Sequence, residues 1–131
     1  MKRHSLISFD RRASLIVVPV TVKTEEKIWE FDFAVDTGAT ISLINFSSLA
    51  ALGYKQQDSI RTTYTTTASK METVYEFSLD NIMALGLIRR NFKVISRSLP
   101  MGLGIDGLLG LNFFHNKELN INFRLSEIRL S

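Results

Sequence analysis

The stretch that decides the fold is Phe33-Ala34-Val35-Asp36-Thr37-Gly38-Ala39-Thr40. An apolar run leads into a single aspartate, Thr and Gly follow, and Ile41-Ser42-Leu43-Ile44 is again mostly apolar. This pattern predicts a strand, a tight turn and a second strand, with Asp36 at the tip of the turn. A carboxylate is costly to bury unless its charge is paired or its proton is kept. An aspartate between two apolar strands therefore suggests a chemical role.

Length and composition indicate an ordinary globular chain. It has 131 residues, of which 45% are hydrophobic and 22% charged, and its formal net charge is +3. We expect a single domain over residues 1–131, with a core over about 15–128 and a loose arm or an edge strand at 1–12. The basic residues form no long block and do not alternate with aromatic residues, so we expect no nucleic-acid partner.

Several kinds of chemistry are excluded by residue content. The chain has no cysteine, which excludes disulfides, thiolate catalysis and Cys-based zinc sites. Its two histidines, His4 and His115, are far apart in sequence, so we expect neither a metal nor another cofactor. No apolar run reaches the roughly 18 residues of a membrane span, and the N-terminus does not resemble a signal peptide. A soluble and cytoplasmic protein is the expectation.

Alternating and β-branched segments predict a mostly β chain. The Thr- and Tyr-rich stretch 60–77 predicts a hairpin that projects from the core, because its strands are only weakly apolar; its polar tip is Thr67-Ala68-Ser69-Lys70. Asn45 is placed to cap a short helix that ends before Gly53. The other expected strands are 15–22, 28–35, 41–44, 74–87, 91–95, 119–123 and 124–130, and a second short helix is expected at 111–116.

Three pieces of the chain, in this order, resemble the retropepsin-like aspartic proteases, the single-lobe branch of the pepsin-type clan. The first is the strand and turn at 33–40, and the second is a hairpin in the position of the flap at 61–75. The third is Gly107-Leu108-Leu109-Gly110, which precedes a helix. The resemblance covers about 15–128 and implies an all-β fold, a closed or partly open barrel with a flap hairpin and one or two short helices.

The chemistry of such a site requires two carboxylates. Hydrolysis of a peptide bond without a metal or a covalent nucleophile needs a water to be activated while the carbonyl is polarised. Two carboxylates that share one proton do both, because close like charges push their two pKa values apart. The chain has one Asp-Thr-Gly, so the second Asp36 must come from a second copy in a two-fold homodimer. We therefore expect an aspartic endopeptidase that cleaves extended polypeptide substrates.

The resemblance also implies roles for the residues around Asp36. Thr37 hydrogen-bonds across the dimer axis, and Gly38 permits the tight turn and offers its carbonyl to the substrate. The hairpin tip closes over an extended peptide, which pairs with it as an added strand. The residues expected to support or bind are Thr37, Gly38, Ala39, Leu108, Leu109 and Gly110 around the turn, and Thr67, Ala68, Ser69 and Lys70 in the flap.

Two departures from the family pattern leave an alternative open. Flap tips in this family usually contain glycine, whereas 67–70 contains none, so a catalytically silent dimerisation or peptide-binding module on the same fold is the second hypothesis. Viral members often carry an Asp and an Arg at the positions of Thr40 and Leu111. Both are absent together, which favours a cellular, bacterial member over a viral one. Asp36 as an ordinary turn residue is the plainest alternative.

Overall fold

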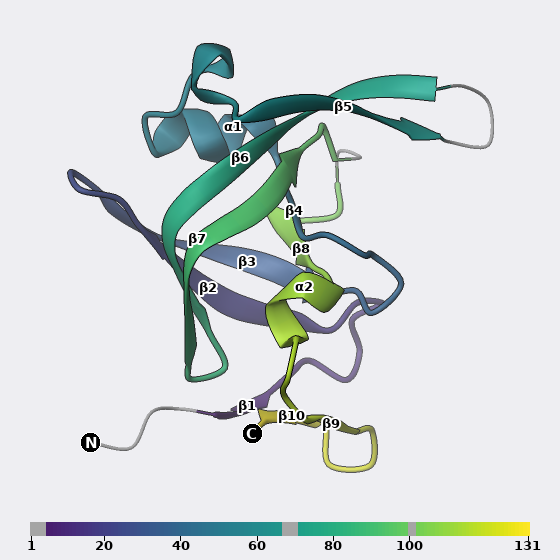
Figure 1. Ribbon diagram of the computed structural model, residues 1–131. Coiled ribbons are helices and arrows are strands. Elements are labelled where there is room, and N and C mark those ends of the chain that lie inside the picture. Colours follow the sequence, from purple (N-terminus) through teal and green to yellow (C-terminus); the bar gives the residue numbers. More distant parts are fainter. Residues whose placement is uncertain (1–4, 67–70, 100–101) are drawn as a thin grey trace.

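The computed structural model describes residues 5–66, 71–99 and 102–131 (Figure 1). The prediction of an all-β chain with two short helices is confirmed. None of the helices within those residues is long and apolar enough to span a membrane. The strands are β1 Leu6–Ser8, β2 Val17–Lys23, β3 Ile28–Val35, β4 Leu43–Ile44, β5 Arg61–Thr66, β6 Met71–Ala84, β7 Leu87–Ser96, β8 Gly107–Leu109, β9 Leu119–Asn122 and β10 Glu127–Leu130; the helical elements are α1 Phe46–Ala51, the 3₁₀ turn η1 Gln56–Asp58 and α2 Leu111–Phe114.

Six strands close into a barrel in the order β2, β3, β8, β4, β7 and β6, with β6 returning to pair with β2. The β3–β8 and β4–β7 pairs are parallel, and the other four pairs are antiparallel. Closure gives each barrel strand two neighbours, which leaves few exposed strand edges. The confirmed fold is thus a closed barrel.

The barrel interior follows from the alternation of side chains along its strands. Val18, Val20 and Val22 of β2 are fully buried, while Pro19 between them faces solvent, as its missing N–H predicts. Strand β3 begins with exposed residues and ends with the buried Phe33. This strand therefore carries the chain from the surface into the core immediately before Asp36.

A second, three-stranded sheet joins the two ends of the chain in the order β1, β10 and β9. Ile7 pairs with the fully buried Ile128 and packs against the main core. Of the two alternatives for 1–12, a loose arm or an edge strand, residues 6–8 form an edge strand, because Ile7 has an apolar surface to cover. The core also extends past residue 128, since Leu130 is buried.

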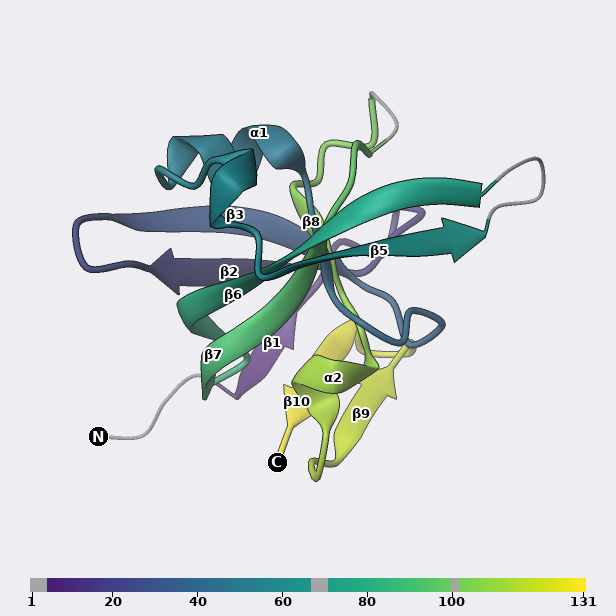
Figure 2. The same cartoon turned by 45° about the horizontal axis from the view of Figure 1, so that its top comes forward.

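Strand β6 belongs to two parts of the molecule. Its first residues pair with β5, from Arg61 opposite Glu76 to Thr66 opposite Met71, and its later residues pair with β7 inside the barrel. The far end of the β5–β6 hairpin projects beyond the barrel, as predicted (Figure 1). The loop that follows β3 lies on the same side of the molecule (Figure 2). The tip at 67–70 lies outside the described residues.

Candidate active site

Asp36 lies in a turn that is closed by its own hydrogen bonds. The Gly38 backbone N–H donates to Asp36 Oδ1 at 2.9 Å, and the Ala39 N–H donates to the Asp36 carbonyl at 3.1 Å. A Cβ on residue 38 would lie 3.1 Å from the same carboxylate oxygen, so glycine lets the carboxylate fold over the turn. Asp36 is half-buried, whereas Thr37 and Gly38 are exposed. The carboxylate is thus fixed in direction but open on one side.

The floor under this turn is strand β8, which runs between β3 and β4. Val35 pairs with Leu109 on one side and Leu43 with Leu108 on the other. The Asp36 N–H donates to the Leu109 carbonyl at 2.9 Å. Leu109 is fully buried, and Leu108 is half-buried. The structure therefore brings two segments that are about 70 residues apart in sequence into direct backbone contact.

Two glycines allow the floor to approach the turn this closely. A Cβ on Gly110 would lie 2.7 Å from the Ala39 carbonyl oxygen and 2.9 Å from the carbonyl carbon of Ile41. A Cβ on Gly107 would lie 2.4 Å from the Leu43 carbonyl oxygen. Real Cβ atoms do not reach such distances, so both positions exclude every residue with a side chain unless the backbone moves. The Leu111 N–H completes the contact by donating to the Ala39 carbonyl at 2.8 Å.

A side-chain network that the sequence analysis missed holds this floor together. Asn112 Oδ1 accepts from both the N–H and the hydroxyl of Ser42, each at 2.8 Å. Ser42 Oγ accepts from the Gly110 N–H at 2.9 Å, and Asn112 Nδ2 donates to the Lys93 carbonyl at 2.8 Å. The network links the loop after Asp36, the start of α2 and strand β7. Its only sequence signals are a serine within an apolar run and an asparagine two residues after a glycine.

Asp106, the other aspartate that precedes a glycine, is engaged in holding strands together. Its Oδ2 accepts from the Asp32 N–H at 2.9 Å, and its own N–H donates to the Asp32 carbonyl at 2.7 Å. Its carbonyl accepts from the Asn45 N–H at 2.8 Å. These bonds fix the start of β8 against β3 and α1.

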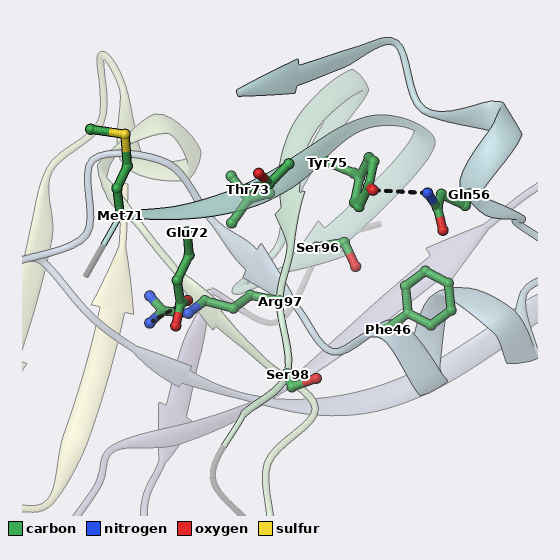
Figure 3. Close-up of a pocket in the computed structure, with 10 residues that line it drawn as sticks. Phe46, Gln56, Met71, Glu72, Thr73, Tyr75, Ser96, Arg97 and Ser98 are labelled. Atoms are coloured by element: carbon green, nitrogen blue, oxygen red, sulfur yellow. Dashed lines mark hydrogen bonds and ion pairs between the residues drawn. The ribbon is translucent and has the colours of Figure 1, made fainter. Parts of the chain in front are cut away.

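A groove of about 720 Å³ lies between strand β6 of the hairpin, the helical elements α1 and η1, and the end of β7 with the segment that follows it (Figure 3). Tyr75 of β6 accepts a hydrogen bond at its hydroxyl from Gln56 Nε2 at 2.8 Å, and Arg97 pairs with Glu72 at 3.3 Å. Asp36 does not line this groove. The predicted flap residues Thr67, Ala68, Ser69 and Lys70 lie outside the described residues. Among the described residues, the lining is Phe46, Gln56, Met71, Glu72, Thr73, Val74, Tyr75, Ser96, Arg97 and Ser98.

The comparisons with known proteins agree with this geometry. A family model described as aspartyl protease matches residues 18–113, so the chain belongs to the aspartyl protease family. The matched segment begins in β2 and ends in α2, and therefore contains the Asp36 turn, the hairpin and the glycine-bounded floor. Family and fold together support a peptidase, a hydrolase of peptide bonds.

Solved structures of other proteins carry the same fold. The chain is similar to the crystal structure of a retropepsin-like aspartic protease from Rickettsia conorii, with a TM-score of 0.73 and 18% sequence identity over 95% of this chain and 87% of that chain. The prediction of a retropepsin-like fold is thereby confirmed. No curated protein matches the chain.

Proposed function

We propose that this protein is a homodimeric aspartic endopeptidase that hydrolyses peptide bonds in extended polypeptides. The observation that carries the proposal is the position of Asp36, which is held at the tip of a hydrogen-bonded turn while Thr37 and Gly38 beside it are exposed. The sequence contains this Asp-Thr-Gly once. A second copy that docks on the exposed turn supplies the second carboxylate and covers Thr37 and Gly38 at the same time.

The reaction follows from two Asp36 carboxylates that share one proton. The ionised carboxylate takes a proton from the bound water, whose oxygen then forms a bond to the carbonyl carbon, while the protonated carboxyl donates to the carbonyl oxygen. Collapse of this tetrahedral intermediate breaks the C–N bond as the protonated carboxyl gives its proton to the leaving nitrogen, while a hydroxyl of the intermediate gives its proton to the other carboxylate and restores the starting state. The two pKa values belong to the pair and not to either residue.

The surrounding residues take supporting roles in this proposal. Thr37 hydrogen-bonds across the dimer axis, and Gly38 and Ala39 shape the turn. The residues that pack beneath the turn and fix its position are Leu108, Leu109 and Gly110. Thr67, Ala68, Ser69 and Lys70 close over an extended substrate, which pairs with the hairpin as an added strand.

The test is peptide cleavage by the purified chain and by Asp36→Asn. We expect the wild type to cleave a denatured protein between about pH 4 and about pH 7, and the variant to lose activity about a thousandfold, because general acid–base catalysis contributes at that scale. Asp10→Asn removes a carboxylate that pairs with Arg12 at the surface and serves as the matched control. Activity that survives in Asp36→Asn contradicts the proposal.

Sedimentation tests whether the chain dimerises, and peptide cleavage then separates the enzyme from the silent module. The monomer is 14.9 kDa, so a dimer is easily resolved. Asp36→Asn is expected to dimerise as the wild type does, because the amide keeps the shape of the turn. A wild type that dimerises and binds peptides without cleaving them at any pH favours the silent module instead.

A further inference from the structure

Glu76 is the one charged residue among the buried side chains of the described chain. It lies on β6 where the hairpin joins the barrel, opposite Arg61 of β5 on one side and Ile95 of β7 on the other. It shares a strand face with the buried Val74, and this face is opposite the one on which Phe77 packs in the barrel core. The proposed chemistry at Asp36 does not use this carboxylate.

The charge of Glu76 is balanced from two strands. Arg61 Nη2 lies 3.0 Å from Oε1, and Lys93 Nζ lies 3.9 Å from Oε2. The Glu76 side chain is 3% exposed, whereas those of Arg61 and Lys93 are 63% and 48% exposed. Oε2 has no hydrogen-bond partner in the described part of the chain. An apolar residue of similar size would fill this site at least as favourably, because desolvation offsets much of the attraction in a buried ion pair.

The three charges lie at the junction between the hairpin and the active-site floor. Arg61 is the first residue of β5, so its bond to Glu76 fixes the outer hairpin strand at its start, where β6 enters the barrel. Lys93 faces Glu76 with its side chain and accepts from Asn112 with its carbonyl. Asn112 in turn holds Ser42 in the loop after Asp36.

We propose that Glu76 is a positioning residue that fixes the β5–β6 hairpin relative to the Asp36 turn. In its catalytic consequence the inference rests on the proposed peptidase function. The hairpin has a second ion pair, Arg97–Glu72, whose carboxylate is 30% exposed and therefore screened by solvent (Figure 3). Glu72 lies on the same strand four residues nearer the tip, which makes Glu72→Gln the matched control.

The first measurement is the hydrogen exchange of the backbone amides in residues 62–66. Glu76→Gln keeps the size of the side chain and removes its charge, so we expect these amides to exchange about tenfold faster while those of β3 stay unchanged. Glu72→Gln is expected to change the rate far less. Unchanged exchange in Glu76→Gln overturns the proposal.

The second measurement is the kinetics of cleavage of an extended peptide. Loosening the hairpin weakens its hold on the substrate, so Glu76→Gln is expected to raise KM about tenfold and to leave kcat within about twofold. A role in stability alone lowers the amount of folded enzyme, which reduces the apparent kcat at unchanged KM; that result overturns the proposal. Arg61→Lys keeps the charge and is expected to retain the wild-type KM.

Two further points keep the test decisive. If Glu76→Gln does not fold, Arg61→Gln removes the partner from the exposed side of the pair, and the same shifts in exchange and KM are expected.

Hydrogen exchange can be measured whether or not the protein is an active enzyme. If the wild type cleaves no peptide but the hairpin amides exchange faster in Glu76→Gln, the positioning role stands and only the peptidase proposal fails. If the wild type cleaves peptides and hydrogen exchange is unchanged in Glu76→Gln, only the positioning role fails.

Discussion

The floor beneath Asp36 and the β5–β6 hairpin are held by different forces. The floor is fixed by backbone hydrogen bonds, two glycine contacts and the buried Ser42–Asn112 pair. The hairpin exposes Tyr64 and Met71, each 67% exposed, and is anchored at its base by ion pairs. Dense packing specifies one geometry, whereas a few charged contacts permit movement about a fixed base. This difference is what the proposed function requires, in which a rigid turn holds Asp36 and the hairpin closes over a substrate.

The largest effect on stability is expected from Gly110→Ala, because the new methyl group clashes with the backbone of the loop above it. Its Cβ would lie 2.7 Å from the Ala39 carbonyl oxygen, and the backbone of Ile41 closes the other side. Such overpacking is expected to lower the free energy of unfolding by about 3 kcal/mol and to displace the Asp36 turn. Urea unfolding and peptide cleavage check the two effects.

Gly53→Ala is the control for this variant. A Cβ there meets nothing within 4 Å, but the residue has φ +95°, so its cost is conformational only. We expect about 1 kcal/mol for this strain and no change in activity per folded molecule. Equal decreases in the free energy of unfolding for Gly110→Ala and Gly53→Ala would show that the floor is no more tightly packed than the end of α1.

A smaller effect is expected when the floor network is cut at Asn112→Ala. The fully buried Ser42 loses the acceptor for its N–H and hydroxyl, and the Lys93 carbonyl loses a donor. An unsatisfied buried polar group costs about 2 kcal/mol, so unfolding in urea is expected to shift by that amount. Asn122→Ala breaks one bond in an exposed turn and is expected to cost less than about 1 kcal/mol. If Asn112→Ala lowers the free energy of unfolding no more than Asn122→Ala does, the role assigned to the network is contradicted.

The smallest effect is expected at the base of the hairpin, where Tyr54 packs edge-on against Phe77 of β6. Burial, assisted by the charges of Asp80 and Asp58, raises the pKa of Tyr54 above its ordinary 10.0. The folded state therefore keeps the Tyr54 proton at a pH where the unfolded chain loses it. This stability is fully present below about pH 10 and is lost as the pH rises toward the folded pKa.

Urea unfolding between about pH 9 and about pH 11 checks the sign. The free energy of unfolding of the wild type is expected to fall more steeply with pH than that of Tyr54→Phe. Tyr64→Phe, which changes an exposed hairpin tyrosine, is expected to follow the wild type. A wild-type slope no steeper than that of Tyr54→Phe would show that the hairpin base does not bury this hydroxyl.

Most of the fold was predictable from local patterns. Local signals come from the alternation along β2 and β3, from the asparagine at residue 45 and from the threonine-rich hairpin. Asn45 occupies the N-cap position of α1, although its side chain makes no capping hydrogen bond. The parallel pairing of β8 with β3, which joins Phe33 to Gly107 within the barrel, leaves no such local signal. The resemblance to a known family placed that floor under the turn, because spacing and composition do not determine pairings between distant segments.

The candidate site likewise contains residues that could be predicted from the sequence and residues that could not. Asp36 was found because a carboxylate between apolar strands violates the local pattern. Ser42 and Asn112 were missed because each is unremarkable until the fold brings them within 2.8 Å. Glu76 carried a faint signal, since it shares a strand face with Val74, but its partners come from two other strands.

The central claim is that the active site needs Asp36 from two copies, and mixing tests it most directly. Wild type and Asp36→Asn are combined in equal amounts at a total concentration where the chain is dimeric, and cleavage is compared with pure wild type at that total concentration. Random pairing predicts about one quarter of the activity, because only dimers with two intact aspartates work. About one half would show that each chain carries a complete site, and would contradict the account.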